Sequence, residues 1–259
     1  MSPERNSTRP AYAAHGLIGV LTPQANTTVE AEFKILLPRG FGMVNARLTS
    51  SKAHIIERLV DYADTLTAQC RQFGNAPLDT LALAVTGTSY YLGPSREDSL
   101  VEQFERDGIG TLVTAARATC AALAALEAKR IDLISPYPDE LTQKSVGYWI
   151  SRGFSVQQVV SIKNSEHSFH PIYALSADAS DIALERCALS GADAVVMLGT
   201  GLPTLHAIAA RTHWTGPPVI SCTLALAWQA ISSCAQNPPD KDTLEQWIRA
   251  QHWRHKLLE

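Results

Sequence analysis

The sequence predicts an α/β protein of two pseudo-symmetric lobes, each with a parallel β-sheet, that face each other across a central cleft. Two stretches carry this prediction: residues 79–93 (DTLALAVTGTSYYLG) and residues 193–205 (DAVVMLGTGLPTL). Each begins with an uninterrupted apolar run, typical of a strand buried on both faces of a parallel sheet, and each run ends at a glycine–threonine step. Ligands of such sheets bind beyond the carboxyl ends of the strands, so both turns are candidate parts of one site.

The first half of the chain alternates predicted strands with predicted helices. Strands are expected at 16–21, at 43–48 and in the apolar run that starts at 79; helices are expected near 29, over 53–73 and over 99–106. Apolar residues recur at helical spacing in 53–73, as in Ile55, Leu59 and Leu66. Asn26, Thr27 or Thr28 can cap the helix that begins near Val29, which places Asn26 in a loop above a strand end.

The order of elements then restarts in the second half. Residues 111–129 are rich in alanine and leucine and predict a tightly packed helix. Strands are expected at 131–134, 154–162, 193–199 and 218–221, and helices at 138–151, 177–190, 205–212, 223–233 and 243–253. Gly87 lies 65 positions after Thr22, and Gly199 lies 64 positions after Ser135, so the two halves have nearly equal spacing.

This alternation implies parallel sheets with right-handed crossovers, in two flavodoxin-like or Rossmann-like lobes. We expect residues 1–15 to form a disordered leader. We expect lobe 1 to comprise 16–115 plus 218–259, because the last strand and helices cross back to it, and lobe 2 to comprise 116–217.

Bulk composition excludes several functional classes. The 259 residues carry a net charge of −3, which argues against a nucleic-acid or anionic membrane surface. No stretch approaches the roughly 20 apolar residues of a membrane span, and residues 1–15 lack the apolar segment of a secretory signal. The five cysteines are widely spaced without a CxxC pair, so we expect free thiols in a reducing cytoplasm. We expect no metal and no cofactor.

Five short motifs resemble those of one enzyme superfamily in order and spacing. They are 23–28 (PQANTT), 86–89 (TGTS), 135–137 (SPY), 199–208 (GTGLPTLHAI) and 219–228 (VISCTLALAW). They resemble, in turn, a P-x-x-N-T loop, a G-T-S turn, a T-P-Y loop, a C-x-x-L-x-x-L-D-A-I segment and a V-x-S-S-N-x-A-x-x-W segment. On these motifs the chain resembles the aspartate/glutamate racemase superfamily, in its maleate isomerase and arylmalonate decarboxylase branch, over about residues 16 to 230.

The resemblance also defines a departure. It implies a catalytic cysteine at the end of the third strand of each lobe, whereas this chain has Gly87 and Gly199 at these positions. Racemisation by two thiols is then excluded, and alkene isomerisation through a cysteine adduct requires a relocated nucleophile. Cys222, at the place of a family serine, is the cysteine nearest a strand end. A packed, inert thiol is the alternative for this residue.

The carboxylate-binding groups of the family have counterparts here. Thr88 and Ser89, with the backbone N–H groups that follow Gly87, are candidates to hold a carboxylate or to stabilise a developing enediolate. Either hydroxyl can instead cap its own turn. The turn at Gly199, Thr200 and Gly201 is the matching candidate of the second lobe.

Three further residues match family positions that hydrogen-bond a substrate carboxylate: Asn26, Tyr137 and Asn164. Asn26 is equally suited to capping a helix, and Tyr137 can instead be an exposed loop residue. The histidines are candidates for a replacement acid or base. His167 and His170 follow the strand that ends at Asn164, and His206 replaces the family's aspartate; a surface or structural role is the default for all three.

The resemblance implies a cofactor-independent lyase or isomerase that acts on a small mono- or dicarboxylic acid. Decarboxylation of a malonate-like substrate through a stabilised enediolate fits the altered site best, with the final proton supplied by water, Tyr137, a histidine or Cys222. The alternatives are a maleate-isomerase-like or ectoine-utilisation-like catabolic isomerase or hydrolase, and a non-catalytic carboxylate-binding protein. The family further implies a cytoplasmic homodimer with a small carboxylate as its ligand.

Overall fold

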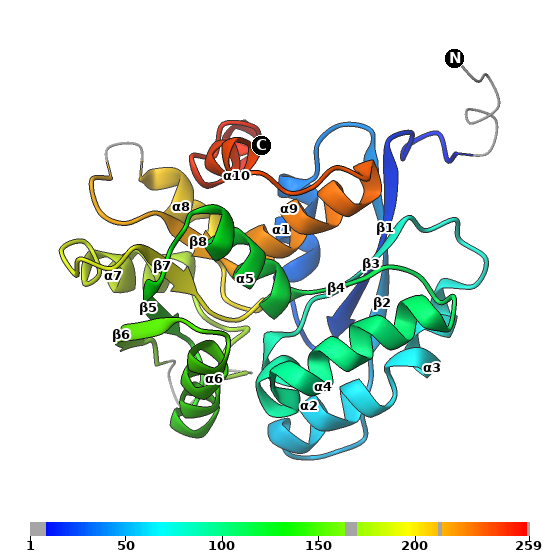
Figure 1. The fold of residues 1–259 in the computed structure, drawn as a ribbon, viewed down its shortest axis with the longest axis horizontal. Helices are drawn as coiled ribbons and strands as arrows, with labels where there is room; N and C mark the ends of the chain where they lie inside the picture. Colours follow the sequence, from blue (N-terminus) through cyan, green and yellow to red (C-terminus); the bar gives the residue numbers. More distant parts are fainter. Residues whose placement is uncertain (1–8, 164–169, 212–213, 258–259) are drawn as a thin grey trace.

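The computed structural model describes residues 9–163, 170–211 and 214–257 and contains two four-stranded parallel sheets (Figure 1). The strands of the first are β1 (Gly16–Pro23), β2 (Phe41–Leu48), β3 (Thr80–Leu83) and β4 (Leu112–Thr114), in the order β2-β1-β3-β4. Those of the second are β5 (Arg130–Ser135), β6 (Ser155–Ser161), β7 (Ala194–Met197) and β8 (Val219–Ser221), in the order β6-β5-β7-β8. The identical strand order confirms the predicted fold of two similar parallel α/β lobes.

Helices flank both sheets. In the first lobe they are α1 (Val29–Leu36), α2 (Ile55–Asp64), α3 (Leu66–Cys70), a 3-10 turn (Arg71–Phe73) and α4 (Thr86–Arg106). They are followed by α5 (Ala115–Ala125), α6 (Asp139–Ser151), α7 (Ala177–Glu185), α8 (Leu205–Ala210), α9 (Cys222–Ala235), α10 (Lys241–Ile248) and a 3-10 turn (Arg254–Leu257). Among the described residues, no helix is long and apolar enough to cross a membrane.

Three predicted elements differ from the structure. The helix α4 begins at Thr86, directly after β3, and is kinked where Gly93 adopts a φ of 72° before Pro94, so its first turn is the predicted glycine turn itself. Residues 112–114 form the edge strand β4 ahead of α5, although the alanine-rich run was predicted as one helix. The predicted helix 53–73 is broken at Thr65 into shorter elements.

The chain ends also differ from expectation. The strand β8 pairs with β7 in the second sheet, so it does not complete the first lobe, whereas the next helix, α9, packs against β1, β3 and α5. Residues 1–8 lie outside the described residues. Residues 9–15 are placed on the first lobe rather than disordered, since Arg9 pairs with Asp79 at 2.8 Å and Ala13 is buried. The lobe boundaries themselves stay a prediction.

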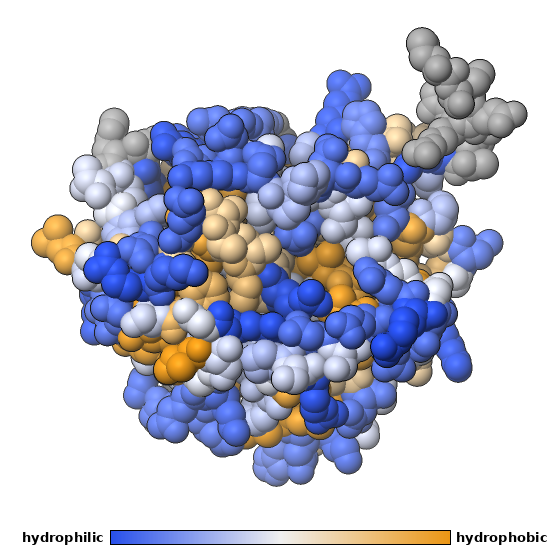
Figure 2. Space-filling model, in the orientation of Figure 1, coloured by the Kyte–Doolittle hydropathy of each residue, from blue (hydrophilic) through white to orange (hydrophobic). Residues whose placement is uncertain are grey.

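The surface of the protein is mixed. Figure 2 shows hydrophilic side chains over most of this face, with hydrophobic side chains in patches between them. The exposed large hydrophobic residues come from different elements: Tyr12, Val44, Val60, Ile150, Ile182 and Leu189. Scattered exposure of this kind is ordinary for a folded protein and does not by itself indicate a partner.

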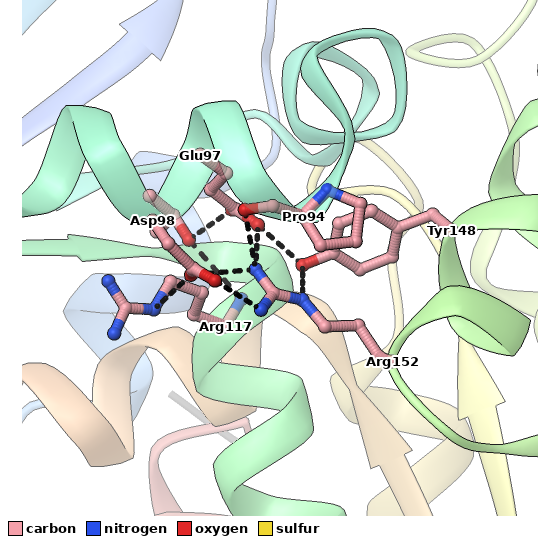
Figure 3. Close-up of polar contacts among 7 residues, drawn as sticks. Pro94, Glu97, Asp98, Arg117, Tyr148 and Arg152 are labelled. Atoms are coloured by element: carbon pink, nitrogen blue, oxygen red, sulfur yellow. Dashed lines mark hydrogen bonds and ion pairs between the residues drawn. The ribbon is translucent and has the colours of Figure 1, made fainter.

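A buried ionic cluster clamps the two lobes together (Figure 3). Glu97 of α4 is fully buried and accepts hydrogen bonds from Thr114 (2.5 Å), from Tyr148 of α6 (2.5 Å) and from Arg152 (2.8 Å). The guanidinium of Arg152 also pairs with Asp98 at 2.8 Å, which holds the pKa of that carboxyl below its usual range. A buried carboxylate with several charge-assisted partners fixes the packing of α4 on α6, because any displacement leaves a charge unpaired.

We therefore expect Glu97→Gln to lower the free energy of unfolding by about 3 kcal/mol. This value is at the lower end of the range for breaking a buried ion pair, because Arg152 still pairs with Asp98 in the variant. Urea denaturation measures the effect. The matched control is Glu102→Gln, which removes an exposed carboxylate from the same helix and should change stability by no more than about 0.5 kcal/mol. Equal stability of the two variants would contradict the role given to the clamp.

Candidate active site

A cavity of about 50 Å³ lies between the carboxyl ends of the two sheets. The first lobe lines it with Pro23, Gln24, Ala25, Ile55, Arg58, Leu59, Tyr62, Val85, Thr86 and Gly87. The second lobe lines it with Tyr137, Leu141, His170, Ile172, Tyr173, Gly199, Thr200 and Gly201. Both predicted glycine turns therefore reach one cavity, as the position of ligand sites in parallel sheets requires.

The space in front of Gly87 is filled by a side chain of α2. A Cβ on Gly87 would lie 2.8 Å from Cδ1 of Leu59, closer than real Cβ contacts allow. The Leu59 backbone is held in turn by Thr88, whose hydroxyl donates to its carbonyl oxygen at 2.9 Å. The predicted ligand contact of Thr88 has no geometric support here, because its side chain faces α2. The same is true of Ser89, whose buried hydroxyl is not part of the cavity wall.

The space in front of Gly199 is filled by a hydroxyl group. A Cβ on Gly199 would lie 3.1 Å from Oη of Tyr137 and 3.2 Å from Pro136, and the φ of +84° also disfavours any side chain at this position. Tyr137 is buried, not exposed in a loop, and its hydroxyl lies 2.6 Å from Oγ1 of Thr86 in the other lobe. The two glycine positions thus differ: a hydrocarbon covers Gly87 and a phenol covers Gly199.

The phenol of Tyr137 stays protonated at neutral pH. Burial raises its pKa well above the usual value, and the nearby thiol of Cys222 raises it further. The Tyr90 ring packs edge-on against the Tyr137 ring, with centroids 6.0 Å apart. Burial likewise raises the pKa of Tyr90. The cavity therefore contains a neutral proton donor next to the Gly199 turn.

Cys222 lies behind this turn rather than in the cavity wall. Its side chain is fully buried, and burial raises the pKa of its thiol to about 11, although the N–H of Gly199 and the hydroxyl of Thr119 oppose the shift. A thiol with this pKa is overwhelmingly protonated near pH 7 and is a poor nucleophile. All five cysteines are free thiols, and none lines the cavity.

Arg58 provides positive charge at the cavity. It stands on α2 between Ile55 and Leu59; one of its terminal nitrogens donates to Ala53 at 2.8 Å, and its buried Nε has no partner among the described residues. His170 lines the cavity too, and burial together with Arg58 lowers its pKa. No aspartate or glutamate is among the described lining residues. The cavity is therefore suited to an anion.

Tyr173 closes the cavity on the second lobe's side. Its ring stacks on that of His170, with centroids 3.8 Å apart. It also covers Gly201, where a Cβ would come within 2.3 Å of the ring. Glycine at 201 is thus required by the close approach of this ring.

The other predicted site residues have mainly structural contacts. Asn26 caps α1, since its Oδ1 accepts from the N–H of Thr28 (2.8 Å) and of Val29 (3.1 Å), while its buried Nδ2 has no partner within the described ranges. Thr200 lines the cavity, but its hydroxyl donates to the Ala84 carbonyl at 2.6 Å. His206 is exposed on α8 and outside the cavity wall. The predicted ligands Asn164 and His167 lie outside the described residues.

Sequence reasoning missed Arg58 and Tyr173 as cavity residues. Arg58 follows Ile55 by three positions and precedes Tyr62 by four, so it shares the inward face of an amphipathic helix. A cation on an otherwise apolar helix face is the signal that identifies it. Tyr173 lies in an irregular segment between β6 and α7, for which periodicity gives no orientation. Within the described part of the chain, no group of three or more metal-ligating side chains is present.

The filled space in front of Gly87 makes a testable prediction. We expect Gly87→Ala to destabilise the fold by about 1–3 kcal/mol through overpacking against Leu59. Leu59→Ala should relieve most of this cost when the two changes are combined, as a double-mutant cycle measured by urea denaturation would show. Additive costs in the cycle would contradict the direct contact.

The chain is similar to known proteins over most of its length. The family model described as arylmalonate decarboxylase matches residues 18–243. The maleate isomerase of Pseudomonas putida is 26% identical over 238 residues, which cover 85% of this chain and 92% of that protein.

Solved structures show the same fold. The maleate isomerase of Pseudomonas putida S16 superposes with a TM-score of 0.76 at 22% identity, covering 86% of this chain and 94% of the other. For a crystal structure of arylmalonate decarboxylase the TM-score is 0.64 at 20% identity, with 84% and 92% covered. The family model matches residues 18–243, which is most of this chain, and this match shows that the chain belongs to the arylmalonate decarboxylase family.

Proposed function

We propose that this protein is a cofactor-independent decarboxylase of a small malonate-like dicarboxylic acid, with the hydroxyl of Tyr137 as the proton donor. The observation that carries the proposal is the Tyr137 hydroxyl over Gly199, at the position where the family resemblance implies a catalytic thiol. Membership of the arylmalonate decarboxylase family supports the reaction type, and the cation at the cavity supports an acidic substrate.

Arg58 and the start of α4 are the proposed carboxylate-binding groups. The N–H groups in the first turn of a helix have no intrahelical acceptor, and α4 has no side-chain cap at Val85. They adjoin the cavity at Thr86 and Gly87, where they can stabilise the negative charge that develops on an enediolate. The second carboxylate faces the apolar wall formed by Ile55, Leu59 and Leu141, where poor solvation favours its loss as CO₂.

The proposed reaction has two steps. The bond between the α-carbon and the second carboxylate breaks, CO₂ leaves, and the electron pair stays on the enediolate of the retained carboxylate. The Tyr137 O–H then transfers its proton to the α-carbon, which gives the monocarboxylic acid and a phenolate. Because the pKa of Tyr137 is raised, the phenolate regains a proton from solvent readily, and the net reaction consumes one proton and releases CO₂.

The alternative activities rest on weaker support. Isomerisation of maleate is the activity for which the maleate isomerases above are named. A cysteine adduct would need a thiolate in the cavity, and the described cavity wall contains no cysteine. An ectoine-utilisation-like isomerase or hydrolase would need another nucleophile at the cavity. A non-catalytic carboxylate-binding protein remains the second candidate, because the cation and the N–H groups suffice for binding without chemistry.

The assembly and the location are further proposals. The family resemblance implies a homodimer, and five free thiols are consistent with a reducing cytoplasm. Analytical ultracentrifugation of the purified protein measures whether it is a dimer.

Tyr137→Phe tests the proton donor, because it removes the hydroxyl and keeps the ring. With a panel of malonate, hydroxymalonate and substituted malonates, followed by proton NMR in heavy water, we expect wild-type turnover of at least one acid. We expect kcat to fall at least about 100-fold in the variant, as for loss of a general acid, with the substrate Kd changed only a few-fold.

Cys222→Ser is the matched control for this test and should keep kcat within a few-fold of wild type. A panel left untouched by the wild type would reject the decarboxylase. A Tyr137→Phe variant with unchanged kcat would reject Tyr137 as the donor.

Arg58→Gln tests the anion site independently. We expect the malonate Kd, measured by calorimetry, to rise at least about 10-fold, because the variant loses a charge-assisted pair. Arg96→Gln, on an exposed part of α4, is the control with unchanged Kd. Equal affinity in the two variants would place the anion elsewhere.

A further inference from the structure

Glu32 is a buried carboxylate of the first lobe that binds the second. It stands on α1 with an exposed fraction of 5%. Its Oε1 accepts from the N–H of Thr204 (2.6 Å) and of Leu205 (3.2 Å) at the start of α8, and from the Thr204 hydroxyl (3.0 Å). Thr204 has no capping bond of its own, so a residue of the opposite lobe caps this helix. These contacts lie three residues beyond Gly201, which lines the cavity.

The segment from Gly199 to Leu205 is tied to the first lobe at three points. The Thr200 hydroxyl donates to the Ala84 carbonyl, at the end of β3 (2.6 Å). The Thr28 hydroxyl donates to the Gly201 carbonyl (2.9 Å). Glu32 provides the third tie. Thr28 is the N-cap residue of α1 and Glu32 lies four residues later in that helix, so the start of α1 holds the turn both at Gly201 and at Thr204 and Leu205.

We propose that Glu32 is a positioning residue, which holds the 199–205 turn from the opposite lobe and so keeps Gly199 against the Tyr137 hydroxyl in the cavity wall. Its role in the reaction rests on the proposed function. Neither Glu32 nor Thr204 lines the cavity, so Glu32 acts through the turn alone.

Among the three ties, Glu32 is the titratable one. Burial raises the pKa of Glu32 to about 7, and the hydrogen bonds from Thr204 and Leu205 oppose this shift. The titratable side chains of the elements around it are Glu30 and Lys34 on α1, the exposed His206 on α8, the thiols of Cys222 and Cys234 on α9, and Arg254, His255 and Lys256 of the 3-10 turn that contacts α8 and the end of α1. The principal cause is burial and not a charged neighbour.

The sign of the pH effect follows from this shift. A raised pKa means that the closed turn favours the protonated carboxyl, whereas an opened turn exposes Glu32 to water and lets its pKa return toward 4.5. The closed turn therefore loses stability as the pH rises from about 4.5 to about 7, and the loss is complete above that range. The hydroxyl of Thr223 lies beside Glu32 and is buried without a hydrogen-bond partner among the described residues, so a protonated carboxyl, or an amide at position 32, can donate to it.

Two substitutions of Glu32 distinguish the effect of its hydrogen bonds from the effect of its ionisation. Glu32→Ala removes the acceptor and leaves the N–H groups of Thr204 and Leu205 unpaired at every pH. Glu32→Gln keeps an acceptor and cannot ionise. The experiment is hydrogen–deuterium exchange by mass spectrometry on peptides that cover 199–205, at pH 5 to 8, normalised to the intrinsic exchange rate. Glu102→Ala, on the exposed face of α4, is the control.

We expect Glu32→Ala to speed exchange of the 199–205 peptides at least 10-fold at all pH values, and the control to leave it unchanged. In the wild type, protection should fall between pH 5 and 7; in Glu32→Gln it should persist without this pH dependence. If Glu32→Ala does not fold, the comparison of wild type with Glu32→Gln still decides. Unchanged exchange in Glu32→Ala, or the same pH dependence in wild type and Glu32→Gln, would overturn the proposal.

Ligand binding and turnover complete the test. We expect Glu32→Ala to weaken malonate binding and to lower kcat/KM at least 10-fold, and Glu32→Gln to restore most of both near pH 7. If the turn opens but binding and kcat/KM stay at wild-type values, Glu32 is not a positioning residue. If the wild type turns over no acid, the proposed function fails, whereas the exchange and malonate-binding results still decide the role of Glu32.

Discussion

The close approach of Tyr137 to Gly199 is the constraint on which the candidate site depends. The Gly199 backbone has a positive φ and the Tyr137 hydroxyl lies where a side chain would begin, so position 199 has no room for a catalytic group of its own. The same hydroxyl reaches Thr86 at the start of α4. The Tyr137 phenol therefore fills the space that a side chain at position 199 would occupy, and its contact with Thr86 joins the second lobe to the first. Leu59 fills the equivalent space at Gly87 but contributes only hydrocarbon. In the proposed reaction, this difference between the two lobes assigns proton transfer to the Tyr137 side of the cavity.

This geometry requires a fixed distance between the two lobes. Buried polar groups on both sides of the site hold the lobes at that distance. The Glu97–Arg152 cluster fastens α4, whose first turn lines the cavity, to α6, which follows the Tyr137 loop. On the other side, Glu32 of α1 and Thr28, the N-cap residue of that helix, hold the Gly199–Leu205 turn. Buried charges are costly unless they are fully paired, so they oppose sliding of one lobe over the other more strongly than apolar packing alone would.

Most of the fold could be predicted from the sequence because the inner strands β1, β3 and β7 are buried on both faces and form largely apolar runs. The predictions failed where local propensity and tertiary context disagree. The strand β4 was not predicted, because it has only three residues, 112–114, and they adjoin an alanine-rich run that favours a helix. Thr86 to Ser89 have the composition of a loop but form the first turn of α4, and the helix is interrupted only later, at Gly93 and Pro94. β8 is too short for periodicity to assign its sheet.

The site could be located from the sequence, but its chemistry could only partly be assigned. The two glycine steps and the SPY loop identify the cavity, and Tyr137 lies in its wall. No one-dimensional pattern shows that the Thr88 hydroxyl points to Leu59 and not to a ligand, or that Cys222 lies behind the turn, because both facts depend on side-chain direction within a helix that begins at the strand end. Arg58 is visible in the sequence as a cation on an apolar helix face, but it can be assigned to the site only once that face of α2 is known to line the cavity.

The most direct test of the central claim is a crystal structure of the protein with malonate bound. The account predicts one carboxylate within hydrogen-bond distance of Arg58 and the N–H groups at the start of α4, with the α-carbon facing Oη of Tyr137 over Gly199. A malonate bound outside the cavity, or bound with Tyr137 turned away and the Cys222 thiol facing the α-carbon, would contradict it.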